Sequence, residues 1–110
     1  MQRTVLSCLA AAALFAAVAQ APNPQSRGDP RAGHEIAERW CSNCHLVDRG
    51  QRSATDVTPS FYTIAGKPTT SADTLAAFLH MPHEASRMPE FHLSETDIKN
   101  LVAYILSLRG

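Results

Sequence analysis

Three residues in the stretch "RWCSNCHLV" could do chemistry together. Cys41, Cys44 and His45 stand at positions i, i+3 and i+4, so their side chains share one face of a helical turn. Two thiols at this spacing can add to the two vinyl groups of a porphyrin, and the imidazole can then bind its iron. This C-x-x-C-H pattern is the attachment signature of c-type haem. It predicts one haem c, linked covalently through Cys41 and Cys44, with His45 as an iron ligand.

Two other uses of these side chains compete with haem attachment. A structural zinc site usually takes its ligands as two close pairs, and no second pair follows His45. A thioredoxin-like C-x-x-C needs a βαβ setting, which a chain without strand patterns does not offer. Zinc binding and thiol redox chemistry are therefore the minor alternatives.

The N-terminal segment has the pattern of a secretory signal peptide. Arg3 precedes an apolar run over residues 5–18, and small residues follow, which is the order found in a cleavable leader. A membrane anchor is the alternative, but the run is shorter than the roughly 20 residues of a spanning helix. We expect residues 1–19 to be removed, with cleavage after Ala19 or Ala21. The protein would then work in the periplasm without stable membrane insertion.

A single small helical domain is expected after the leader. Residues 20–28 are polar and rich in proline, which indicates a flexible linker. Over residues 29–110 apolar side chains recur at helical spacing, and no segment alternates as a strand would. The predicted fold class is therefore all-α. Helices are predicted over residues 30–41, 59–66, 72–81 and 95–108, and loops over residues 46–58 and 82–93.

Capping residues mark where several of these helices begin. Asp29 and Pro30 suit the N-cap and the first position of the first helix. Ser71 precedes the third helix, and Ser94 with Asp97 three residues later resembles a capping box at the start of the last. These signals are local, so they predict helix starts independently of the apolar pattern.

The charge and size of the chain narrow its function. The formal net charge is zero and no basic patch stands out, which argues against a nucleic-acid partner. A domain this small has a high ratio of surface to volume and often depends on a metal or cofactor for its stability. Composition therefore agrees with a small cofactor-binding domain.

Nearly all of the exported part resembles the class I cytochrome c family. "AGHEIAERWCSNCH" is similar to the first helix and haem-binding turn, and "TPSF" to the proline stretch beneath the proximal histidine. "RMPEF" is similar to the loop with the axial methionine, and "LSETDIKNLVAYILSL" to the last helix. The resemblance implies a class I cytochrome c fold, with three to four helices wrapped around one covalently attached haem.

The resemblance also implies contacts around the haem. The backbone carbonyl of Pro59 would accept a hydrogen bond from the ring of His45 and fix its orientation. Leu101 and Ile105 would pack on the haem. The aromatic residues are expected to line the haem pocket or the core: Phe61, Tyr62, Phe78, Phe91 and Tyr104.

The resemblance also implies that the first and last helices cross in close contact. Gly33 would lie at this crossing near Tyr104, because only a small residue permits so close an approach. The family often has an aromatic residue where this chain has Ala37. We expect Trp40 to fill that space instead.

The second iron ligand is predicted to be Met88. Both Met81 and Met88 precede a proline, so the local motif does not separate them. Met81 lies at the end of the third predicted helix, where it should pack in the core, whereas Met88 lies in the loop where the family has its ligand. A second histidine is the alternative. His34 is expected to face solvent, and the other candidates are His80, His83 and His92.

Iron held by His45 and Met88 has both axial positions filled, which favours one-electron transfer over reaction with oxygen or peroxide. We expect a periplasmic electron carrier with no catalytic residues, which shuttles single electrons between a donor protein and an acceptor protein. Methionine ligation would raise its reduction potential. A small haem subunit fixed in a dehydrogenase or oxidase complex is the alternative, and an open-site haem enzyme or sensor is less favoured.

Overall fold

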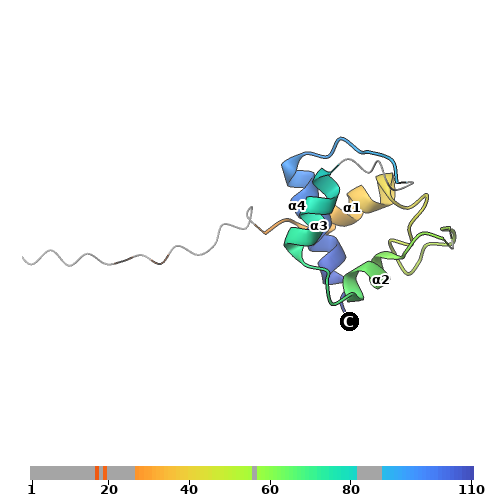
Figure 1. The fold of residues 1–110 in the computed structure, drawn as a ribbon, viewed down its shortest axis with the longest axis horizontal. Coiled ribbons are helices and arrows are strands. Elements are labelled where there is room, and N and C mark those ends of the chain that lie inside the picture. Colours follow the sequence, from red (N-terminus) through yellow and green to blue (C-terminus); the bar gives the residue numbers. More distant parts are fainter. Residues whose placement is uncertain (1–16, 18, 20–26, 56, 82–87) are drawn as a thin grey trace, which may run out of the picture.

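The fold was analysed in a computed structural model, which describes residues 17, 19, 27–55, 57–81 and 88–110 (Figure 1). The predicted leader and linker lie largely outside the described residues, as does His83. Within the described part the chain forms α1 (Pro30–Trp40), α2 (Phe61–Gly66), α3 (Ala72–His80) and α4 (Glu95–Ser107), and it has no strand. The predicted all-α class is confirmed.

Side-chain caps begin the helices, largely as predicted. Asp29 accepts a hydrogen bond from the N–H of Arg31 at the start of α1. Ser94 and Asp97 form a reciprocal capping box at the start of α4, which satisfies two backbone donors that the helix leaves unpaired. Ser71 caps α3 in the same way.

The predicted start of α2 at Pro59 is wrong by two residues. Helix α2 begins at Phe61, because Ser60 is extended and accepts a hydrogen bond from the N–H of Thr63. Serine is a strong N-cap, and it therefore sets the boundary after the proline. The other helices end one residue earlier than predicted, within the usual fraying of a last turn.

Helices α1 and α4 cross in close contact, and this crossing organises the core (Figure 1). Gly33 is buried, and a Cβ atom on it would lie 2.0 Å from the carbonyl oxygen of Asn100 and 2.7 Å from the Cβ of Tyr104. The predicted place of Gly33 at the crossing, near Tyr104, is thus confirmed. The chain before α1 is held too, since the N–H of Asp29 donates to Asn100 Oδ1 at 2.7 Å.

The expectation that Trp40 fills the space beside Ala37 is wrong. Ala37 is fully buried, whereas Trp40 is 48% exposed and lies against the ring of Phe91, with ring centroids 6.0 Å apart. Trp40 is the last residue of α1, and its side chain lines the cavity described below instead of the crossing. The crossing is therefore filled by small residues of α1 and by Tyr104.

The remaining helices close the domain around the crossing pair. Helices α2 and α3 both pack against α4, and the C-terminus lies beside α2 (Figure 1). Arg109 Nε donates to the carbonyl oxygen of Ala65 at 2.9 Å, and the same guanidinium donates to the carbonyl of Thr70. No helix among the described residues is long and apolar enough to cross a membrane.

Because α1 and α4 are in such close contact, a single methyl group added at Gly33 should destabilise the protein. Gly33→Ala should force the backbones of α1 and α4 apart and lower the free energy of unfolding by about 1–3 kcal/mol or more. Gly50→Ala is the matched control, because nothing lies within 4 Å of the added Cβ; it should change the stability by less than about 0.5 kcal/mol. Denaturant unfolding followed by circular dichroism measures both, and equal stabilities would contradict the crossing.

Candidate functional site

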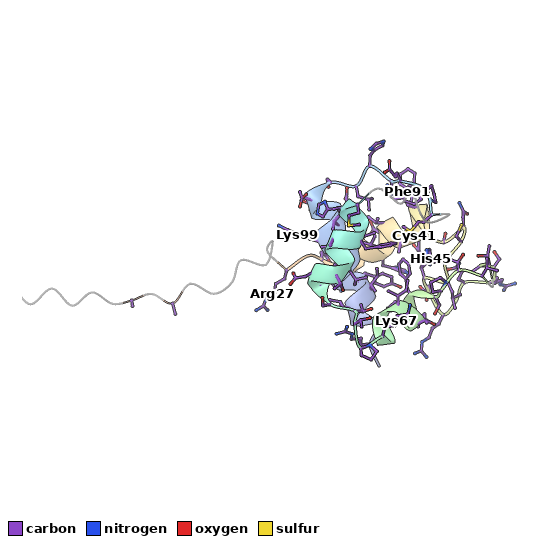
Figure 2. The ribbon with its side chains drawn as sticks, in the orientation of Figure 1. Arg27, Cys41, His45, Lys67, Phe91 and Lys99 are labelled. Atoms are coloured by element: carbon purple, nitrogen blue, oxygen red, sulfur yellow. The ribbon has the colours of Figure 1, made fainter. Side chains whose placement is uncertain are left out.

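A cavity of about 530 Å³ opens between the turn after α1, the segment before α2, helices α3 and α4, and residues 88–91. Its volume lies in the range of roughly 300–1,000 Å³ that is usual for ligand sites, and its walls are mostly apolar. All the residues expected to contact the cofactor line this cavity: Cys41, Cys44, His45, Pro59, Met88, Leu101 and Ile105. Phe91 and Lys67, which also line it, lie on either side of Cys41 and His45 in Figure 2.

A tight turn after α1 brings the two thiols and the imidazole to one wall. The N–H of Cys41 closes the last turn of α1 on the carbonyl of Ala37, and the N–H of His45 donates to the carbonyl of Cys41 at 2.8 Å. Both cysteines are free thiols. Burial, with a smaller contribution from Cys44, raises the pKa of the Cys41 thiol to about 11. Without an attached haem, the Cys41 thiol is therefore protonated at neutral pH.

His45 is held by the residues on both sides of its ring. Its Nδ1 lies 2.6 Å from the carbonyl oxygen of Pro59, and its ring centroid lies 5.3 Å from that of Phe61. A carbonyl oxygen can only accept a hydrogen bond, so Nδ1 carries the proton. The lone pair then belongs to Nε2, which is the nitrogen that can bind a metal. This is the contact with Pro59 that the resemblance implies.

Gln51 fixes the turn around His45, and sequence reasoning missed it. Its amide nitrogen Nε2 donates to the carbonyls of Ser42, His45 and Ser53 at 2.7–2.8 Å, and its Oε1 accepts from the N–H of Val47 at 2.9 Å. One side chain thus contacts four backbone groups in a segment without regular structure. The amide nitrogen carries two hydrogens, so two of the three carbonyls share one of them. A glutamine in a polar loop, six residues after the histidine, carries no sequence signal for this role.

Tyr104 ties helix α4 to the same turn from the other side. Its buried hydroxyl donates to the carbonyl of Val47 at 2.6 Å, two residues after His45. Desolvation, with a smaller contribution from Asp48, raises the pKa of Tyr104 to about 12. Tyr104 belongs to the core rather than to the cavity wall.

The two methionines differ clearly in their surroundings. Met88 is half-buried and lines the cavity. Pro89 and Phe91 of the same segment line it too, and this segment is far from His45 in the sequence. The predicted core packing of Met81 is wrong: its side chain is 60% exposed. Met81 is the C-cap of α3 in an extended conformation, so it has left the apolar face of that helix.

Two further expectations need correction. His34 does not face solvent freely. The loop that follows His45 folds back on α1 and brings Asp48 Oδ2 to 2.8 Å from the Nε2 atom of His34. Tyr62 lines neither the cavity nor the core; it is half-buried, with the guanidinium carbon of Arg49 5.3 Å from its ring centroid. The other aromatic residues behave as expected, with Phe61, Phe78 and Phe91 on the cavity wall and Tyr104 in the core.

Two of the three histidines considered as alternative ligands, His80 and His92, belong to the part of the chain that the structure describes, and His83 does not. His80 and His92 are exposed and do not line the cavity. His80 instead pairs with Glu95, with its Nε2 3.4 Å from Glu95 Oε1.

The donor set of the cavity fits a haem. Two thiols at the spacing of the vinyl groups and a tautomer-fixed imidazole occupy one wall, and a thioether sulfur is present on another. The remaining wall is supplied largely by apolar side chains, including Leu101 and Ile105 of α4. An apolar slot with few polar groups suits a flat hydrophobic ring system whose metal needs two axial donors.

Removing the Tyr104 hydroxyl should loosen the turn that holds His45. Tyr104→Phe leaves the buried carbonyl of Val47 without this donor, so the free energy of unfolding should fall by about 1–3 kcal/mol at neutral pH. The neutral phenol is the stabilising form, because the pKa is raised from 10.0 to about 12 on folding. The stability difference from the wild type should therefore be complete below pH 10 and disappear as the pH rises through 12.

Tyr62→Phe is the control for this prediction. It removes a hydroxyl for which no buried acceptor is found among the described residues, and it keeps the ring beneath Arg49. Denaturant unfolding of both variants between neutral and alkaline pH measures their free energies of unfolding and tests this prediction. A Tyr104→Phe protein as stable as Tyr62→Phe at neutral pH would show that the hydroxyl does not stabilise the turn.

Comparison with known proteins adds two findings. The model of the family described as cytochrome C oxidase, cbb3-type, subunit III matches residues 28–105. The chain is also similar to cytochrome c-552 of Bradyrhizobium diazoefficiens, with 42% identity over 96 residues, which cover 87% of this chain and 90% of the relative. No solved structure matches the chain.

Proposed function

Because the chain belongs to the cytochrome c family matched above and is a monohaem electron carrier, we propose that His45 and Met88 are the two axial ligands of its haem. The observation that carries this proposal is the shared cavity, which both side chains line from different segments of the chain. A bound haem c supplies one-electron chemistry between its ferrous and ferric states. The protein contributes attachment, orientation and exclusion of water.

Attachment is the role we propose for the two cysteines. Cys41 and Cys44 each form one thioether link, so the cofactor stays bound even when the chain unfolds. His45 Nε2 binds iron, and the hydrogen bond from its Nδ1 to the Pro59 carbonyl at 2.6 Å holds the ring in the required tautomer. The turn is stiff because Gln51 and Tyr104 hold the backbone on both sides of this histidine.

Met88 is the second ligand in this proposal. Support comes from its position on the cavity wall, whereas Met81 is 60% exposed and the exposed histidines lie elsewhere. A thioether ligand raises the reduction potential. Leu101 and Ile105 are both at most 3% exposed, and they keep water away from the inner side of the cavity.

The compartment and the partners follow from the N-terminal pattern and the chemistry. We propose that the leader directs the chain to the periplasm, where it exchanges electrons with a donor protein and an acceptor protein. A fixed subunit is the second candidate, because the matching family is described by a subunit of an oxidase. The mobile carrier is supported by the relative that is matched over 90% of its length, because its name, cytochrome c-552, does not describe a subunit of a larger enzyme.

The methionine variants test the ligand pair. Met88→Ala should abolish the ferric methionine–iron charge-transfer band, lower the reduction potential within the roughly 0.8 V span that axial ligands control, and let carbon monoxide bind the reduced protein. Met81→Ala is the matched control and should leave the band, the potential and the stability unchanged, because its side chain is largely exposed. Haem staining after denaturing electrophoresis first establishes that each variant still carries its haem covalently.

The opposite pattern would overturn the assignment. Loss of the band in Met81→Ala alone would make Met81 the ligand. Retention of the band in both variants would exclude both methionines as the sole ligand. A wild-type spectrum without this band would instead favour a second histidine, and His80→Gln, His83→Gln and His92→Gln would then identify it.

Gentle purification separates the mobile carrier from the fixed subunit. The protein should be released with the periplasmic fraction on osmotic shock and should elute in gel filtration at the mass of a single chain with its haem. A fixed subunit would instead elute at high mass at a constant ratio to other polypeptides. Repeating the run at low and high salt controls for weak electrostatic association, which salt screens.

A further inference from the structure

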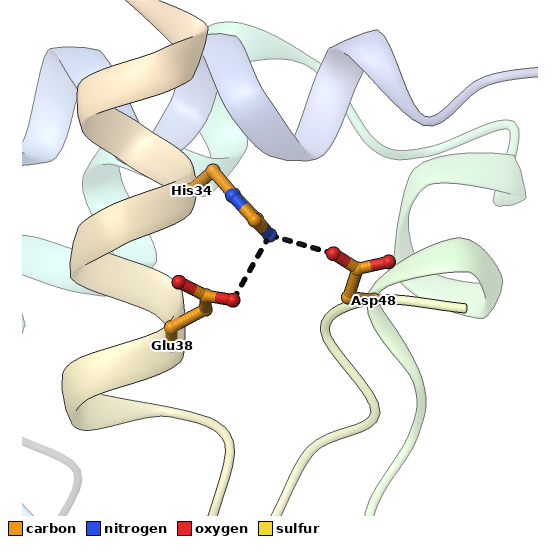
Figure 3. A group of neighbouring side chains, drawn as sticks. All are labelled: His34, Glu38 and Asp48. Carbon is orange, nitrogen blue, oxygen red and sulfur yellow. Dashed lines mark hydrogen bonds and ion pairs between the residues drawn. The ribbon is translucent and has the colours of Figure 1, made fainter. Parts of the chain in front are cut away.

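Three side chains that could hold a metal ion lie together beside α1, and none of them lines the cavity. His34 and Glu38 stand at i and i+4 on α1, and Asp48 comes from the loop after the turn that carries His45 (Figure 3). The His34 Nε2 atom lies 3.6 Å from Glu38 Oε1 and 2.8 Å from Asp48 Oδ2. One ligand atom from each residue lies within 4.8 Å of the others.

Contacts outside the group hold two of the three side chains in place. The ring of His34 packs against Tyr104, with centroids 4.9 Å apart and planes at 51°. Asp48 accepts the N–H of Gly50 with its Oδ1 at 3.3 Å, which leaves Oδ2 turned towards His34. The Gly50 N–H and, second to it, the hydrogen bond from His34 hold the pKa of the Asp48 carboxyl below its usual value. Asp48 is therefore ionised at neutral pH.

The donor atoms suit zinc better than the harder cations. Zinc takes imidazole nitrogen and carboxylate oxygen at about 2.0–2.2 Å, so that tetrahedral ligands lie roughly 3.3–3.6 Å from one another. The separation of 3.6 Å between His34 and Glu38 matches this spacing, and the hydrogen-bonded separation of 2.8 Å from Asp48 would lengthen by about 0.5 Å. Calcium and magnesium prefer sites built from oxygen alone.

The exposure of the three side chains determines which further ligands a bound metal would have. The side chains of His34, Asp48 and Glu38 are 31%, 44% and 57% exposed, so water can reach the position between them. A metal there would keep one or more water ligands, as zinc does where the protein supplies only three. The site is thus accessible to an ion from solution and independent of the haem cavity.

We propose that His34, Glu38 and Asp48 bind one Zn²⁺ ion on the surface of the folded protein. The ion replaces the hydrogen bond between His34 and Asp48 and links α1 to the loop that follows His45. Because the three ligands come together only in the folded chain, binding stabilises the fold.

Calorimetric titration of the haem-loaded protein with zinc chloride tests the proposal. The wild type should bind one equivalent, and binding should be at least tenfold weaker in His34→Gln, Glu38→Gln and Asp48→Asn. Glu35→Gln removes an exposed carboxylate from the same helix, and His80→Gln removes the histidine of the other carboxylate pair. Both controls should bind zinc as tightly as the wild type.

A second readout does not depend on whether the variants fold. In the wild type, zinc should shift the imidazole NMR signals of His34 and leave those of His80 and His92 unchanged, while the haem absorption spectrum stays the same. Absence of zinc binding by the wild type would overturn the proposal and leave the group as a hydrogen-bonded contact between α1 and the loop. Tight binding that survives in Glu38→Gln and Asp48→Asn, or is lost in His80→Gln, would overturn it as well.

Discussion

The backbones of α1 and α4 touch at Gly33, with no room for a side chain between them. The rest of the domain depends on this constraint. It fixes the axis of α1, and therefore the direction in which the chain leaves that helix at Cys41. It also brings Tyr104 of α4 within reach of the Val47 carbonyl. The same contact thus positions the cysteine-bearing turn and supplies the donor that holds the following loop.

Around His45 the backbone is more firmly held than a loop usually is. Pro59 accepts from the ring, Gln51 donates to the histidine's own carbonyl, and Tyr104 holds the residue two positions later. Each of these partners comes from a different part of the chain. As the iron ligand proposed above, His45 would need little rearrangement when the charge on the iron changes, because its orientation is set by groups that do not take part in the reaction.

Sequence reasoning succeeded where a signal is local and failed where a loop folds back on a helix. The cap at Ser94 with Asp97 could be predicted directly, because its role depends on residue type and spacing. The place of Gly33 at the crossing was implied by the resemblance to the family, and the structure agrees with it. The surroundings of His34 could not be predicted from the sequence. Periodicity indicates which face of α1 this residue occupies, but not that the loop brings Asp48 into contact with it. The prediction for Met81 failed for a different reason: α3 ends at His80, and Met81 is its extended C-cap, so helical spacing no longer places its side chain.

The network at Gln51 has an evolutionary consequence. One amide hydrogen-bonds to the backbone of residues 42, 45, 47 and 53, so the shape of the loop depends little on some of its other side chains. Arg52 is exposed, as is Gly50, which has open space around it. Such positions can drift in size and charge among related chains while the loop conformation persists. Glutamate at position 51 would be far less tolerated despite its similar shape, because it would turn a carboxylate towards three carbonyl oxygens.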